Sequence, residues 1–228
     1  MLEILRDNGL YLLVGQFPQG PLGGLALTLI LAAVSLAAAL PLGIVLAVGR
    51  LAKTSVIRWS VTALIWIVRG TPLLMMIFWA YFLVPLLVGK RIPGVLTLVV
   101  ALVIFTAAYV AEIIRAGVEA LPRGQWEAAA SLGLTRRQAL AQVVLPQALR
   151  NMLPSLVNQF VSLTKDTSLA FIVGISELTY VASKVNDRTL SHPAEIFFIV
   201  AVAYFVICFA LTSYARRLER QLAWGRRA

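Results

Sequence analysis

Ionisable side chains inside long apolar runs are the residues of this sequence that could do chemistry. Glu112, Arg115 and Glu119 follow one another at spacings of three and four residues at the end of one such run. This spacing places them on one face of a helix, where they can form ion pairs along it. The face predicts either a salt-bridged ladder at the end of a membrane helix or a gate that contacts a charged solute.

Lys165 and Asp166 form a second group, about midway along the apolar run 153–175. Adjacent residues in a helix point in directions about 100° apart, so these two cannot neutralise each other face to face. Each therefore needs a partner on another helix or a water-filled cavity. Two interpretations remain open, an aqueous pathway or its gate and structural pairing between helices. Arg69 offers a similar choice between an interface anchor and a gate.

The composition places these charges in a membrane protein. Of 228 residues, 60% are hydrophobic and 13% are charged, whereas a soluble domain carries about 25% charged residues. A bilayer core of roughly 30 Å requires about 20 apolar helical residues per crossing. The predicted fold class is therefore an all-α membrane protein with about five transmembrane helices. The expected spans are 22–49, 66–88, 94–118, 153–175 and 194–214.

The basic residues predict the orientation of these spans. Twelve of the 20 Lys and Arg residues, Arg226 and Arg227 among them, fall on the side that holds residues 119–152, and five fall on the other side. The positive-inside rule then predicts an external N-terminus, a cytoplasmic C-terminus and a cytoplasmic 119–152 segment. In a soluble chain the formal charge of +10 would suggest nucleic acid. Here we expect no nucleic-acid partner, because the basic residues serve as anchors at the lipid surface.

The 119–152 segment is long for a connection between neighbouring spans. Good helix formers occupy 126–130 and 137–144, with Gly133 between them. Its small residues allow close approach to another surface, and Trp126 is an anchor of the kind enriched at interfaces. Glu127 is expected in the initial turn of a short helix, where negative charge is favourable. Docking onto a partner and lying on the lipid surface both remain open from these patterns.

Several blocks of the sequence, in their order along the chain, resemble the polar amino-acid uptake branch of ABC-importer permeases, the histidine/glutamine/glutamate type. The stretch from Gly124 to Pro146 resembles the EAA loop of those permeases, and the similarity extends from about residue 25 to the C-terminus. The other blocks are VRGTPLL at 68–74, AYVAEIIRAG at 108–117, LPQA at 145–148 and TKDTSL at 164–169.

The resemblance implies a type I importer permease of MetI-like architecture in the bacterial cytoplasmic (inner) membrane. Its implied partners are a cytosolic ABC ATPase dimer, a second permease that is identical or paralogous, and an extracytoplasmic solute-binding protein. The family's coupling helix falls on residues 126–134. The implied ATPase-coupling residues are Trp126, Glu127, Ala128, Ala129, Gly133 and Leu134. The candidate pathway or gate residues are Lys165, Asp166, Glu112, Arg115 and Arg69.

The chain is expected to be a transport subunit and not an enzyme. It contains no GxxxxGK[ST] phosphate loop, so ATP and Mg are expected to bind to the partner ATPase, with no cofactor or metal in this chain. The alternative is an ion-gradient-driven secondary transporter or channel subunit. Five spans and the absence of an inverted hydropathy repeat argue against that alternative. Glutamate or aspartate, glutamine, histidine and other basic amino acids are all candidate substrates.

Overall fold

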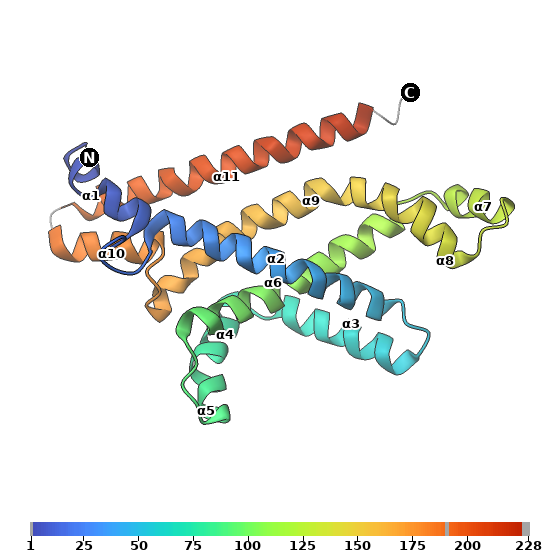
Figure 1. Cartoon of the computed structure of the whole chain (residues 1–228), viewed down its shortest axis with the longest axis horizontal. Coiled ribbons are helices and arrows are strands. Elements are labelled where there is room, and N and C mark those ends of the chain that lie inside the picture. The colour runs from blue at the N-terminus through green and yellow to red at the C-terminus, as the bar shows by residue number, and fades with distance from the viewer. Residues whose placement is uncertain (1, 190–191, 225–228) are drawn as a thin grey trace.

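The computed structural model describes residues 2–189 and 192–224, which fold into helices joined by short turns (Figure 1). The predicted all-α architecture is confirmed. The α-helices are α1 Leu2–Val14, α2 Gly24–Arg50, α3 Ser55–Gly70, α4 Leu73–Phe78, α5 Val84–Val88, α6 Gly94–Glu119, α7 Arg123–Ser131, α8 Arg136–Ala139, α9 Leu145–Asp166, α10 Leu178–Thr189 and α11 Pro193–Trp224. Two π-helical turns, η1 Trp79–Leu83 and η2 Leu140–Val144, and the 3-10 helix η3 Thr167–Val173 complete the described elements.

Length and composition support three or four membrane spans among the described residues. The helices α2, α6 and Pro193–Arg217 of α11 are each long and apolar enough to cross a bilayer. A fourth span requires α3 and the following run Leu73–Val88 to be taken together, although they are bent by 103°. The expected span 66–88 runs across this bend. Thr71 is extended, as residues before proline tend to be, and Pro72 has no N–H to continue the helix.

The expected span 153–175 corresponds to α9 and η3, with different boundaries. The α-helix begins at Leu145 and ends at Asp166, and 3-10 geometry follows to Val173. Lys165 and Asp166 therefore lie where α9 ends and η3 begins, and their depth in the membrane stays a prediction. The helix α9 is not among the helices that are apolar enough to qualify as spans, because it contains many polar residues.

Small side chains bring α2 and α6 together at the centre of the molecule. Ala32, Ser35, Ala39, Gly43 and Ala47 recur every three or four residues along α2, and all are buried. A Cβ on Gly43 would lie 2.5 Å from the Val110 Cγ1 atom of α6. Small residues at such contacts allow close backbone approach, which is how membrane helices gain packing energy.

A second core joins α1, α10 and the start of α11 around the buried Glu177. Glu177 has 0% exposure and precedes α10. Its carboxylate accepts hydrogen bonds from the backbone N–H groups of Thr179 at 2.9 Å and Tyr180 at 2.8 Å, and from the Tyr204 hydroxyl of α11 at 3.0 Å. The neighbouring Leu178 N–H donates to Thr28 Oγ1 of α2 at 3.1 Å. Glu177 thus caps α10 and ties it to α11.

Replacing Glu177 with Ala should destabilise this end of the molecule. Three part-buried donors would lose their acceptor, which is expected to lower the free energy of unfolding by about 2–3 kcal/mol. Glu177→Gln is the matched control, because its amide oxygen can still accept, and we expect a smaller loss. Thermal unfolding of the purified protein measures both. An unchanged unfolding temperature for Glu177→Ala would contradict the anchoring role.

The two ends of the bundle carry different structures. One end, called here the α10 end, holds α1, α10 and the start of α11, and the other, the α7 end, holds α7 and α8 (Figure 1). The described chain starts at the α10 end, and α11 runs from there towards the α7 end. The orientation itself stays a prediction, and Arg226 and Arg227 lie outside the described residues.

Candidate functional site

Glu112 lies at the centre of an ion-pair cluster from three helices. Its Oε2 accepts a hydrogen bond from Arg50 Nη1 of α2 at 2.6 Å and lies 3.6 Å from Arg69 Nη1 of α3. Its Oε1 accepts from Arg115 Nε at 3.1 Å, and Arg115 also pairs with Glu119. The predicted pairing of the three α6 residues along one helical face is confirmed. Arg50, 62 residues away in sequence, completes a cluster in which three guanidinium groups face two carboxylates.

Arg69 links this cluster to the bend between α3 and α4. It lies in the last turn of α3, and its guanidinium carbon is 5.1 Å from the ring centroid of Tyr109 on α6. A cation over an aromatic face is attracted by the ring quadrupole. Because Arg69 contacts both Tyr109 and Glu112, a change in the angle of α3 relative to α6 would alter both contacts.

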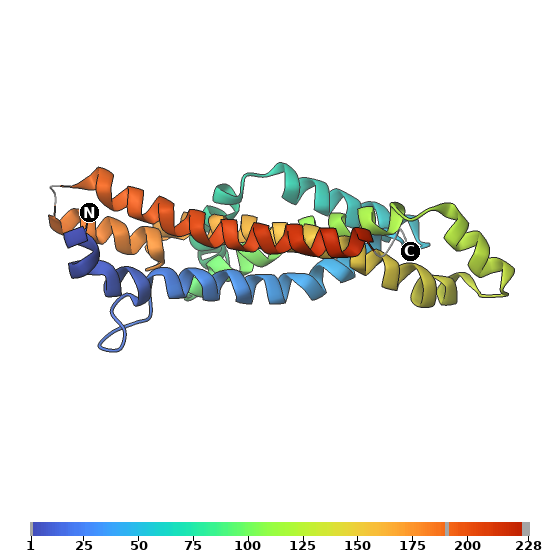
Figure 2. The same cartoon turned by 90° about the horizontal axis from the view of Figure 1, so that it is seen from above.

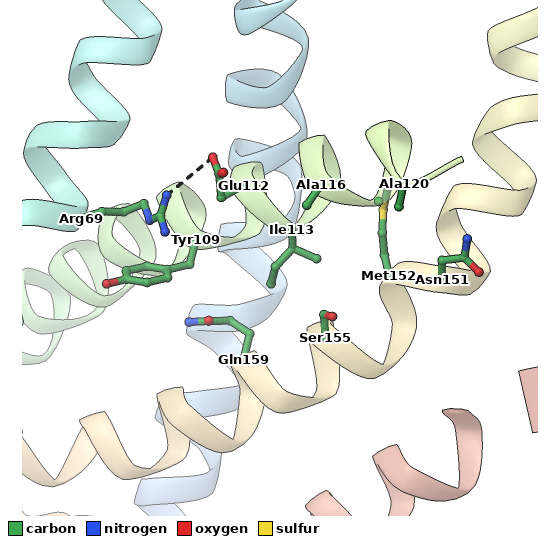
Figure 3. Close-up of a pocket in the computed structure, with 11 residues that line it drawn as sticks. Arg69, Tyr109, Glu112, Ile113, Ala116, Ala120, Asn151, Met152, Ser155 and Gln159 are labelled. Atoms are coloured by element: carbon green, nitrogen blue, oxygen red, sulfur yellow. Dashed lines mark ion pairs between the residues drawn. The ribbon is translucent and has the colours of Figure 1, made fainter. Parts of the chain in front are cut away.

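A cavity of about 370 Å³ opens beside the cluster (Figure 3). Polar groups lie on both sides of it, and Figure 3 shows Gln159 and Ser155 extending from α9 towards the side chains of α6. Its polar lining consists of Arg69, Tyr109 and Glu112 on the side of α3 and α6, and of Asn151, Ser155 and Gln159 on the side of α9.

A polar stripe on α9 extends from this cavity to the end of the helix. Asn151, Ser155, Gln159, Ser162 and Asp166 recur every three or four residues and so share one helical face. All five are exposed or partly exposed. At 1.5 Å per residue the stripe is about 22 Å long. Polar groups facing lipid would be costly, so this face requires water or another polypeptide beside it.

Lys165 and Asp166 lie at the far end of the stripe. Lys165 is exposed and Asp166 is partly exposed. Within the described part of the chain, neither side chain forms a hydrogen bond or ion pair with another helix. Ion pairing of Lys165 and Asp166 with another helix is therefore not observed among the described residues. This favours water or a second polypeptide as the partner of these charges.

The segment with the predicted coupling residues projects beyond the other helices in both views (Figures 1 and 2). Its first helix, α7, spans residues 123–131, three residues earlier than the expected 126–134. Because Pro122 is the N-cap, Glu127 lies in the middle of α7, and the prediction that it occupies the initial turn is wrong. A hydrogen bond of 2.9 Å between the side chains of Gln147 and Gln125 ties α7 to α9.

Gly133 ends α7 through its backbone conformation. Its φ of +77° lies in the left-handed region that glycine adopts without steric cost. The Gly133 N–H donates to Ala130 O at 2.9 Å, and the Leu134 N–H donates to Ala129 O at 3.1 Å. This pair of bonds is the Schellman motif, which satisfies the last carbonyls of a helix. Thr135 then starts α8 with a capping box to Gln138.

A hollow of about 430 Å³ lies between α7 and α8. Arg123 and Arg136 are among the residues that line it. Ala129 is only 2% exposed, so it packs inside the segment and is not available to a partner. Of the remaining predicted coupling residues, Trp126, Glu127 and Leu134 line the hollow, and Ala128 and Gly133 are exposed.

Sequence patterns missed two parts of this site. The sequence presents Arg50 only as an orientation charge, because no local spacing connects it to Glu112. Asn151, Ser155 and Gln159 were also missed, although their spacing of four residues within an apolar stretch was visible in the sequence. Intramembrane polar residues that recur on one helical face are a signal for a solvated or protein-covered surface.

The long apolar helices, the polar stripe on α9 and the projecting α7–α8 segment are together the features of a multi-helix membrane protein. Residues 39–224 match the family described as the binding-protein-dependent transport system inner membrane component, and the chain belongs to this family. It is therefore a multi-pass inner-membrane protein.

Named relatives of the chain are amino-acid transport permeases. It is 39% identical over 208 residues to the inner membrane amino-acid ABC transporter permease protein YhdY of Escherichia coli, with 90% of this chain and 57% of the relative covered. It is 38% identical over 198 residues to the probable glutamine ABC transporter permease protein GlnP of Bacillus subtilis, with 86% and 90% covered. The chain thus spans little more than half of the length of YhdY.

Solved structures confirm the MetI-like fold. The crystal structure of an amino acid ABC transporter with histidines superposes with a TM-score of 0.87 at 31% identity, covering 96% of this chain and 97% of the other. The inward-facing MetNI methionine ABC transporter superposes with a TM-score of 0.69 at 22% identity, covering 86% and 92%, and this similarity concerns the fold alone.

Proposed function

We propose that the chain is the membrane-spanning permease subunit of an ATP-driven importer for polar amino acids. The observation that carries this proposal is the α9 stripe, which continues the polar cavity beside Glu112 towards Asp166. A row of amides, hydroxyls and charges suits a zwitterionic solute, because such groups can replace its hydration shell. The names of the relatives support amino acids as the substrate class.

A second permease, identical or paralogous, completes the pathway. Lys165 is exposed, and the polar face of α9 is only partly covered by the described part of this chain. A second polypeptide facing α9 across a water-filled space would give these groups polar surroundings. The two permeases together would then enclose the solute.

The α7–α8 segment is the proposed contact with a cytosolic ABC ATPase dimer. It projects from the bundle and presents Trp126, Glu127 and Leu134 around a hollow. The helical run from Thr135 through α8 and η2 continues into α9, so movement of the segment would be transmitted to the polar stripe. ATP and Mg would bind to the ATPase, and the movement would be a rigid-body change of the kind known for packed helices.

Reconstitution tests this function. The chain is assembled in lipid nanodiscs with its ATPase and its second permease, and ATP hydrolysis is measured while the solute-binding protein and amino acids are added. We expect hydrolysis to rise with the binding protein loaded with a polar amino acid. Hydrolysis that does not respond to any loaded binding protein would refute the importer. Uptake that depends on an ion gradient and not on ATP would instead support a secondary transporter.

Replacing Asp166 with Asn should reduce transport more than assembly. The carboxylate has no partner on another helix within the described residues, so its loss leaves no buried group unpaired there. We expect uptake in proteoliposomes to fall by about 10-fold, which corresponds to a loss of one strong charge interaction in the pathway. Ser162→Ala, one turn away on the same stripe, is the uncharged control. Uptake by Asp166→Asn equal to that of the wild type would remove Asp166 from the pathway.

A further inference from the structure

A polar cavity of about 280 Å³ lies at the α10 end, far from the coupling segment. Its walls come from α1, from the turn at residues 15–23, from Ser176 just before α10 and from α10 itself. Lys184 and Arg188, one helical turn apart on α10, both line it. Gln16 and Ser176 add further polar groups to the lining. The transport pathway proposed above uses none of these residues.

Aromatic rings contact both cations of the cavity. Lys184 Nζ lies 5.3 Å from the ring centroid of Tyr180, and Arg188 Cζ lies 5.3 Å from that of Tyr11 on α1. These contacts restrict the long side chains, so less rotamer entropy is lost when they bind an anion. The cavity therefore presents two positioned cations.

The positive charge of the cavity is only partly balanced. Lys184 has one ion pair, at 3.9 Å, with Asp187, and the two side chains are 45% and 59% exposed. Exposed pairs of this kind contribute little to stability. Arg188 has no ion pair within the described part of the chain. A guanidinium offers paired N–H donors that match the two oxygens of a carboxylate.

We propose that this cavity receives a carboxylate side chain of the solute-binding protein when that protein docks at the α10 end. The inference rests on the proposed importer function, which requires such a partner on the side opposite the ATPase. Charge complementarity selects an acidic group. Apart from its aromatic residues, the lining contains two larger apolar side chains, those of Pro21 and Val181. The cavity therefore lacks the apolar channel that would hold a lipid acyl chain.

Docking at this place would act directly on helices of the bundle. The backbone of α10 is tied through Glu177 to Tyr204 of α11, and the Leu178 N–H is bonded to Thr28 of α2. A carboxylate held by Lys184 and Arg188 would therefore restrain α10 together with α11 and α2. This gives the docked protein a physical connection to the transmembrane helices.

The double variant Lys184→Gln/Arg188→Gln tests the proposal. In nanodiscs of phosphatidylcholine, ATP hydrolysis by the assembled complex is titrated with the solute-binding protein. We expect the half-maximal concentration to rise by about 10-fold, because charges at an interface chiefly affect association. The difference from wild type should shrink at about 0.5 M salt as the charges are screened. An unchanged half-maximal concentration overturns the proposal.

Two controls keep the result specific. Lys90→Gln/Arg91→Gln removes two exposed charges on the same predicted side but outside the cavity, and it should behave like wild type. Lys184→Gln alone affects a side chain that is 45% exposed and should fold normally, with a smaller shift in the same direction. A shift that is equal in the control and in the cavity variant would assign the effect to general surface charge, against the proposal.

The nanodisc composition separates the remaining sources of an anion. If variant and wild type differ only in discs that contain phosphatidylglycerol, the cavity binds a lipid phosphate and the proposal fails. If the wild-type complex is not stimulated by the binding protein at all, the importer function itself fails. If the wild type is stimulated and the cavity variant responds identically, only the docking site is refuted.

Discussion

Replacing Glu112 with Gln is expected to reduce amino-acid uptake by at least about 10-fold, because its carboxylate is the shared partner of the cations in a partly buried ion cluster. The carboxylate accepts from Arg50 and Arg115 and lies beside Arg69. Without it, three guanidinium groups at the meeting point of α2, α3 and α6 repel one another. The variant should change the angle between these helices, and with it the cavity that they line.

Glu119→Gln is the matched control for this prediction. Glu119 lies on the same helix, but its side chain is 63% exposed and its only ion pair with a described residue is with Arg115. We expect its uptake to stay within about twofold of wild type, as exposed pairs contribute little. Uptake, the amount of assembled complex and the unfolding temperature are measured for both variants. Normal uptake by Glu112→Gln would exclude the cluster from gating, and a parallel loss of assembly and uptake would assign it to structure alone.

Gly133→Val is expected to uncouple the permease from the ATPase. A β-branched residue is strained at a φ of +77°, by roughly 1–2 kcal/mol or more, so the turn that ends α7 should change. Apart from its chain neighbours, no atom lies within 4 Å of the position of a Cβ at Gly133, so the expected effect comes from the backbone and not from a clash of this atom. We expect the helices of the bundle to stay folded while binding-protein-stimulated ATP hydrolysis falls by about 10-fold.

Gly133→Asn separates backbone strain from surface contact. Asn tolerates the left-handed region better than other non-glycine residues, so it preserves the turn while adding a side chain to the exposed surface. If Asn retains coupling and Val loses it, the turn is what matters. If both lose coupling, the surface of Gly133 itself contacts the ATPase. Gly124→Ala is the control at another open glycine. Normal coupling by Gly133→Val would refute the docking role of this segment.

Much of the candidate site follows from local spacing in the sequence. The ladder of Glu112, Arg115 and Glu119 was predictable, because residues three and four apart meet on any α-helix. Gly133 was predictable as a break between two helices, since glycine destabilises the interior of a helix and is common just after its end. The boundaries of α7 and α9 were less predictable, because helix formers continue on both sides of the true ends.

The bend after α3 shows the limit of local patterns. The Arg69-Gly70-Thr71-Pro72 sequence indicated an interruption, and Pro72 explains why α3 stops there. The angle of 103° between α3 and the run that follows depends on how each part packs against α6. A hydropathy pattern contains no information on that direction.

The sequence by itself determined that the chain is a helical membrane protein with ionisable residues within and between its apolar runs. The physical reason is that backbone polar groups in lipid must be satisfied within the helix, so apolar runs of sufficient length have one solution. The spacing of residues along an α-helix likewise determined which charges share a face.

Only the tertiary structure decided which charges meet across helices. Arg50 reaches Glu112 because small residues let α2 pack closely on α6, and Tyr11 reaches Arg188 because α1 packs on α10. Contacts between residues so distant in sequence depend on the crossing and offset of whole helices, which many side chains determine together.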